Sequence, residues 1–129
     1  MINKMYQQYF MTGIFYEMIN GTQTPCEVKD IFLSALAATN DQSLVAAVTG
    51  KRIVVLSGTI SPSAAAGLIS FKSAALVKHR YYLGANPDRV LIPPQPWGAF
   101  STLTGEALLV DNTSANVVAI SIRYIEVTP

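Results

Sequence analysis

Hydrophobic and polar positions alternate along the C-terminal stretch of the chain, residues 116–127. One set of alternate positions holds large apolar or aromatic side chains: Val118, Ile120, Ile122 and Tyr124. The other set holds Ala119, Ser121 and Arg123. Successive side chains of a β-strand point to opposite faces of its sheet, so this pattern predicts a long strand with one buried face.

Residues 77–83 show the same alternation. The positions expected on one face are Val77, His79, Tyr81 and Leu83. The positions expected on the other face are Lys78, Arg80 and Tyr82. This segment therefore predicts a second strand, with an imidazole and a phenol on the same side.

Further short apolar segments are separated by glycine, proline and Asn-Asp breaks. The remaining predicted strands are residues 31–38, 43–49, 51–60, 68–72, 89–92 and 106–111. Residues 39–42 are expected to form a polar turn, and the proline-rich residues 93–96 a stiff loop. About eight short strands at fairly even spacing predict an all-β fold, a β-sandwich, with a jelly roll as one candidate topology.

The run Ile53-Val54-Val55-Leu56 is apolar at every position. A strand of this kind is covered on both faces. It is therefore expected either in the middle of the sandwich or against a neighbouring subunit.

Residues 1–29 differ from the rest of the chain and are expected to form an N-terminal arm, with the sandwich domain over residues 30–129. The arm is rich in aromatic side chains: Tyr6, Tyr9, Phe10, Phe15 and Tyr16. The apolar spacing fits a short amphipathic helix, and the aromatic content also fits an extended arm or edge strand. Termini are poorly ordered unless something ties them down, so these five residues are predicted to bind a partner.

The chain has 129 residues, enough for one domain with its own core. Half of the residues are hydrophobic and only 13% are charged. Ordinary soluble domains carry about 25% charged residues, so apolar surface and a place in an assembly are expected. The net charge of +1 comes from scattered residues, which argues against nucleic-acid binding.

A single cysteine, Cys26, allows no internal disulfide and indicates synthesis in a reducing compartment. Polar residues interrupt the N-terminal apolar positions, so no secretion signal is expected. No stretch approaches the roughly 18 apolar residues of a membrane span.

No arrangement of residues in the sequence indicates catalysis, and no metal or cofactor is expected. His79 is the only histidine and has no cysteine or carboxylate at ligand spacing. The serines lie in no Gly-x-Ser-x-Gly motif, and no glycine-rich phosphate loop is present. The few carboxylates lie mostly at turns and strand ends, which disfavours a glycosidase pair. The sequence therefore predicts a protein that is not an enzyme.

Trp97 follows the proline-rich segment and has two interpretations. An exposed aromatic side chain on a stiff loop is a good anchor for a protein partner or a sugar ring. Alternatively, the indole folds down and closes one end of the sandwich. Trp97 is included among the candidate partner-binding residues.

Three phrases of the sequence are characteristic: SLVAAVTGKRIVVLSGTIS, GLISFKSAAL and GEALLVDNTSANVVAISIRYIEV. In wording and order they resemble small virion proteins of tailed bacteriophages, namely the β-sandwich decoration (cement) proteins and related accessory proteins. The resemblance implies a homo-oligomer, with a trimer expected, bound to the major capsid protein on the outside of the head. It also implies location in the virion after assembly in the host cytoplasm, without nucleic-acid or membrane contacts.

The sequence does not resemble this family before about Asn40 or in residues 78–96. The position of the protein within the virion is therefore left open. A tail, adaptor or fibre-associated protein of the same fold is one alternative. A carbohydrate-binding module is another, with Trp97, Tyr81 or Tyr82 as the aromatic platform.

Overall fold

The computed structural model describes residues 15–63, 67–84, 89–94, 98–114 and 116–129; for residues 15–19 it describes the backbone alone. The strands are β1 (Phe15–Ile19), β2 (Thr22–Cys26), β3 (Lys29–Leu36), β4 (Thr39–Val45), β5 (Arg52–Pro62), β6 (Gly67–Ser73), β7 (Leu76–Leu83), β8 (Val90–Ile92), β9 (Phe100–Ser101), β10 (Leu108–Asn112) and β11 (Val118–Val127). None of the described residues is helical. Accordingly, the described part of the chain contains no helix that could cross a membrane.

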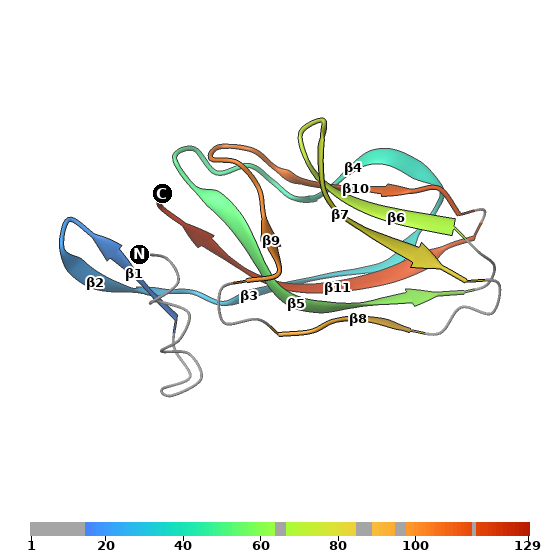
Figure 1. Ribbon diagram of the computed structural model, residues 1–129, viewed down its shortest axis with the longest axis horizontal. Helices are drawn as coiled ribbons and strands as arrows, with labels where there is room; N and C mark the ends of the chain where they lie inside the picture. The colour runs from blue at the N-terminus through green and yellow to red at the C-terminus, as the bar shows by residue number, and fades with distance from the viewer. Residues whose placement is uncertain (1–14, 64–66, 85–88, 95–97, 115) are drawn as a thin grey trace.

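Two antiparallel sheets pack against each other, which confirms the predicted β-sandwich (Figure 1). One sheet has the strand order β4-β10-β6-β7. The other has the order β3-β11-β5-β8, with β9 also paired to β5. Four strand pairs are nested in the sequence, each enclosing the next: β3–β11, β4–β10, β5–β8 and β6–β7. A long antiparallel ribbon that folds over on itself produces this order. This arrangement is the jelly roll, the topology that was a candidate from the sequence.

The core lies between the two sheets and confirms most of the predicted faces. In β11, the side chains of Val118, Ile120 and Ile122 are fully buried and contact the inward residues of the opposite sheet. Ile69 and Phe71 of β6 are likewise fully buried. Removing this apolar surface from water stabilises the sandwich by roughly 25 cal/mol per Å².

The prediction for β7 is right for three of four residues. His79 pairs with Phe71 and Tyr81 pairs with Ile69, so both lie on the core side of their sheet. A bulge intervenes, and Val77 pairs instead with Lys72. The extra residue of a bulge breaks the two-residue period, so Val77 does not share the face of His79.

The doubly apolar segment of β5 is covered on both faces within this chain. Ile53 and Val55 belong to the main core. Val54 and Leu56 form a second buried cluster with Ile125, Val127 and Cys26, against which Val28 packs. The structure therefore accounts for this segment without a neighbouring subunit.

Two local predictions are wrong. Residues 39–42, expected to be a turn, begin β4, an edge strand whose polar side chains face solvent. The helix considered for the N-terminus does not form over Phe15–Ile19, which is β1 of a hairpin. Asn20 and Gly21 connect its strands with φ of 49° and 79°. Positive φ at both loop residues is the requirement of the tight hairpin turn that Asn-Gly favours.

Candidate functional site

The residues predicted to bind a partner fall into two groups. Tyr6, Tyr9, Phe10 and Trp97 lie outside the described residues. The backbones of Phe15 and Tyr16 lie in β1, opposite Cys26 and Pro25 of β2. In Figure 1 the β1–β2 hairpin extends beyond the end of the sandwich. Two-stranded hairpins are at best marginally stable alone, so this projection is suited to contact with something else.

An aromatic cluster lies at the open edge of the sandwich, where β7 of one sheet approaches β9 of the other. The ring of Phe71 is buried in the core and contacts Tyr81 at a centroid distance of 5.9 Å and Phe100 at 5.2 Å. The His79 ring lies parallel to that of Phe100, at 5.8 Å, and 4.6 Å from that of Tyr81. The cluster thus leads from the core to an exposed imidazole.

A shallow groove of about 390 Å³ opens beside this cluster. It is lined by His79, Tyr81, Ile92, Pro93, Gly98 and Ala99. Ala99 is held in place because its amide donates to the carbonyl of Val55 over 2.7 Å. The groove offers aromatic and aliphatic surface with one imidazole and one phenol, and none of the described residues that line it is an Asp, Glu, Lys or Arg.

The sequence placed His79 and Tyr81 on one strand face, but it did not show the aromatic rings around them. Phe100 reaches the cluster through β9, a strand of two residues. So short a segment has no detectable alternation. The aromatic character of Phe100 was the only available signal.

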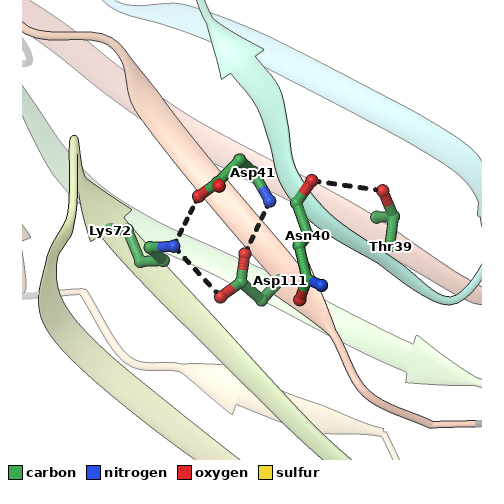
Figure 2. A network of polar contacts seen from close by, with 5 residues as sticks. All are labelled: Thr39, Asn40, Asp41, Lys72 and Asp111. Carbon is green, nitrogen blue, oxygen red and sulfur yellow. Dashed lines mark hydrogen bonds and ion pairs between the residues drawn. The ribbon is translucent and has the colours of Figure 1, made fainter.

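A charged network lies on the outer face of the four-stranded sheet (Figure 2). The Lys72 ammonium contacts the carboxylate of Asp41 and lies 3.2 Å from Oδ2 of Asp111. The amide of Asp41 donates to Oδ1 of Asp111 over 2.7 Å. The hydrogen bond to Asp41, followed by that to Asp111, raises the pKa of Lys72 above its ordinary value. The Lys72 ammonium therefore bridges the two carboxylates, and the network links β4, β10 and β6.

The described residues bring together no group of three or more His, Cys, Asp or Glu side chains that could hold a metal ion. The contacts of His79 that define the aromatic cluster are with rings and not with a carboxylate. Cys26, the single cysteine of the chain, is buried in the second cluster. Neither side chain is placed as part of a nucleophile–base pair with the other.

Alkaline pH should destabilise the protein through the groups described above. Burial raises the pKa of Tyr81 above the ordinary 10.0. Below pH 10 the phenol is neutral in the folded protein and in the unfolded chain, so its contribution to the free energy of unfolding is fully present. Above that pH the unfolded chain loses the proton first. Stability is therefore lost as pH rises through the folded-state pKa, and the raised pKa of Lys72 acts in the same direction. Urea denaturation between pH 8 and pH 11 should show this fall.

The Tyr81→Phe variant should lose part of the alkaline dependence, because it removes the half-buried phenol. Tyr82→Phe is the matched control, since it removes a hydroxyl from the exposed face of the same strand. An alkaline fall of the same size in Tyr81→Phe and in the wild type would show that burial of Tyr81 is not a cause.

No protein-family model and no curated protein matches the sequence. Among solved structures, this chain is similar to the capsular polysaccharide assembling protein CapF from Staphylococcus aureus. The match has 12% identity and a TM-score of 0.30, and covers 85% of this chain but 30% of CapF. A structure of CapF with the inhibitor 3-isopropenyl-tropolone matches with the same values. The chain thus spans less than a third of CapF, and a TM-score this low supports no inference about function.

Proposed function

We propose that this protein is a non-enzymatic virion structural protein, a decoration (cement) protein that binds and stabilises the head lattice of a tailed bacteriophage. The observation that supports it most is the jelly-roll strand order, a topology used by viral capsid domains. The sequence phrases that resemble decoration proteins coincide with strands of this sandwich: the second comprises β6, and the third contains β10 and β11.

Large apolar side chains are exposed on the described surface. They include Phe32, Leu76, Tyr82, Leu91, Leu103 and Val117. Single exposed apolar residues are normal, but here they accompany a low charge content and a projecting hairpin. A rigid sandwich that repeats such contacts across several capsid subunits gains affinity through multivalency, even where each contact is weak.

The proposal includes a homo-oligomer, with a trimer expected, and the major capsid protein as partner. The aromatic residues of the N-terminal segment and Trp97 are the proposed contact residues. A tail, adaptor or fibre-associated position in the virion would use the same contacts.

One observation favours a second candidate function, a carbohydrate-binding module. The groove beside the aromatic cluster combines an exposed His79 ring with the phenol of Tyr81. Sugar rings stack on aromatic faces and take hydrogen bonds from neighbouring polar groups. Jelly rolls also occur in lectins.

The two functions differ in their dependence on His79. Purified protein added to particles that lack it should bind at saturable, lattice-symmetric positions, measured by electron cryomicroscopy. The His79→Gln variant should show the same occupancy, because the groove is not part of the proposed contact. Binding of a saccharide that His79→Gln abolishes, together with no particle binding by the wild type, would replace this proposal with the carbohydrate-binding module.

A further inference from the structure

Within the described part of the chain, the two sheets present four edge strands: β3, β4, β7 and β8 (Figure 1). Three of them carry features that hinder pairing with another strand. β4 is polar and bulged, with Asp41 at a φ of 57°. β7 has a bulge and the charged side chains of Lys78 and Arg80, and the three-residue β8 runs into Pro93. Short, bulged, charged or proline-ended edges resist the addition of a strand.

β3 lacks such protection in its first part, where its register with β11 is regular from Lys29 to Leu33. Its two charged side chains are paired within the sheet. Lys29 Nζ lies 2.8 Å from Glu126 Oε1, and Asp30 Oδ1 lies 3.0 Å from Arg123 Nε. Of the strands that the structure describes, only β11 pairs with β3. The outer edge of β3 therefore presents backbone groups that can accept a further strand.

The centre of this edge is apolar on both faces of the sheet. Phe32 lies opposite Ser121 of β11 on the outer face and is 65% exposed. Ile31 and Leu33 lie on the other face and are only partly buried against the core. Apolar surface that a chain leaves exposed commonly marks contact with a partner. A strand added to this edge would cover all three side chains.

The apolar centre of β3 has the symmetry that a contact between two copies of the chain requires. In a twofold contact the same patch must complement itself. The segment Ile31-Phe32-Leu33 is apolar when it is read in either direction, so an antiparallel copy of β3 brings apolar side chains against apolar ones. Because Lys29 and Asp30 are already paired within each copy, no unpaired charge enters the contact.

We propose that two copies of this chain pair edge to edge through β3, in antiparallel orientation, about a twofold axis at Phe32. On the outer face, Phe32 lies opposite Phe32 of the second copy. On the core side, Ile31 of each copy lies opposite Leu33 of the other. The two five-stranded sheets then form one continuous sheet, and the edge N–H and C=O groups of β3 gain backbone partners.

The position of the axis follows from the side chains on the edge. An axis at Phe32 gives three apolar pairs, and cross-strand pairs of aromatic and β-branched residues stabilise a sheet. An axis at Ile31 would instead set each Phe32 opposite an Asp30 carboxylate, so the aromatic pair would be lost. The irregularity of β3 lies between Leu33 and Leu36, outside the three apolar pairs.

Disulfide trapping tests this contact directly. Phe32→Cys is made in the full-length chain together with Cys26→Ser, so that each molecule carries one thiol. Directly opposite residues of antiparallel strands have Cβ atoms about 5 Å apart, close to disulfide reach. Mild oxidation should therefore link two chains through position 32, detected as a covalent dimer by mass spectrometry under denaturing conditions.

Leu91→Cys in the same Cys26→Ser background is the matched control. Leu91 is 59% exposed on the same face and in the same cross-sheet row as Phe32, but it lies on the protected edge strand β8. Its initial rate of cross-linking should be at least about tenfold lower, because only position 32 is held at a high effective concentration by the contact. Equal rates for the two variants would overturn the proposal.

Sedimentation equilibrium supplies a second measurement, which does not depend on whether the cysteine variants fold. The wild type should show an equilibrium between monomer and dimer. Phe32→Lys should weaken this association at least about tenfold, because it sets two like charges opposite each other at the axis. Leu91→Lys is the matched control and should leave the association unchanged.

Two results would overturn the proposal. One is a wild type that stays monomeric at every concentration, whether solvent or another segment of the same chain covers the edge. The other is an oligomer that Phe32→Lys leaves intact or that both substitutions weaken equally. A twofold contact closes as a dimer, so the trimer expected in the virion would form through other surfaces. Neither measurement involves phage particles, so failure here leaves the proposed function standing.

Discussion

Replacing Asn112 with aspartate should destabilise the sandwich by about 3–5 kcal/mol, a large share of the roughly 5–15 kcal/mol that holds a domain folded. Asn112 ends β10 and is 1% exposed. Its Nδ2 donates to the carbonyls of Leu36 over 2.9 Å and Asn116 over 3.2 Å, and its Oδ1 accepts from the amide of Ser114. A carboxylate would lose both donors and place its charge against two carbonyl oxygens.

Urea denaturation at neutral pH measures this loss, with Asn40→Asp as the control. Asn40 is exposed in β4, so the same chemical change there should alter stability by less than about 0.5 kcal/mol. Acid should partly restore the stability of Asn112→Asp. Burial disfavours the charged form and so raises the pKa of the new carboxyl in the folded protein. The loss of stability therefore shrinks as the pH falls through this raised pKa, and the effect of the charge is gone below the ordinary value of about 3.9. A stability within 0.5 kcal/mol of the wild type would contradict the role of Asn112 as a buried bridge.

Two glycines lie where neighbouring segments approach so closely that an added side chain would not fit. A Cβ atom on Gly67 at the start of β6 would lie 2.7 Å from Cα of Ser114, and one on Gly58 in β5 would lie 2.9 Å from Cδ1 of Ile122. Both distances are shorter than real Cβ contacts, and backbone is an obstacle at each glycine: that of Ser114 at Gly67 and the carbonyl oxygen of Ser121 at Gly58. These glycines allow neighbouring strands to approach closely.

The alternation of residues 116–127 was enough to predict β11 and its buried face, because that strand is central and one of its faces meets the core. The polar residues Thr39–Gln42 gave no such signal, because they belong to an edge strand that faces solvent. Bulges defeat the two-residue period, so the position of Val77 could not be predicted.

The N-terminal hairpin carries a local sequence signal, because Asn20-Gly21 lies between two short strands and this dipeptide favours a tight hairpin turn. The second buried cluster could not be predicted, because it depends on Cys26 meeting Val54 and Ile125 from distant parts of the sequence. Candidate binding surfaces are harder still, since the groove at His79 is formed by strands of both sheets.

Deleting residues 1–24 should leave the sandwich folded but greatly weaken oligomerisation or attachment to particles. The deletion removes all five aromatic residues of the segment and most of the β1–β2 hairpin, but keeps Cys26 and Val28, which contribute to the second cluster. Burial of one aromatic side chain contributes roughly 1.5–3 kcal/mol before ordering costs, so losing several should dominate the binding free energy. The strands from β3 to β11 retain their pairing, so circular dichroism should still report β structure.

The measurement compares the occupancy of full-length and truncated protein on particles that lack it. Deletion of residues 1–5 alone is the matched control, because it shortens the same terminus and keeps every aromatic residue of the segment; its occupancy should be close to that of the full chain. Equal occupancy of all three proteins would rule out the N-terminal segment as an attachment device. An unfolded 1–24 truncation would show instead that the segment belongs to the core, because the sandwich could not then form without it.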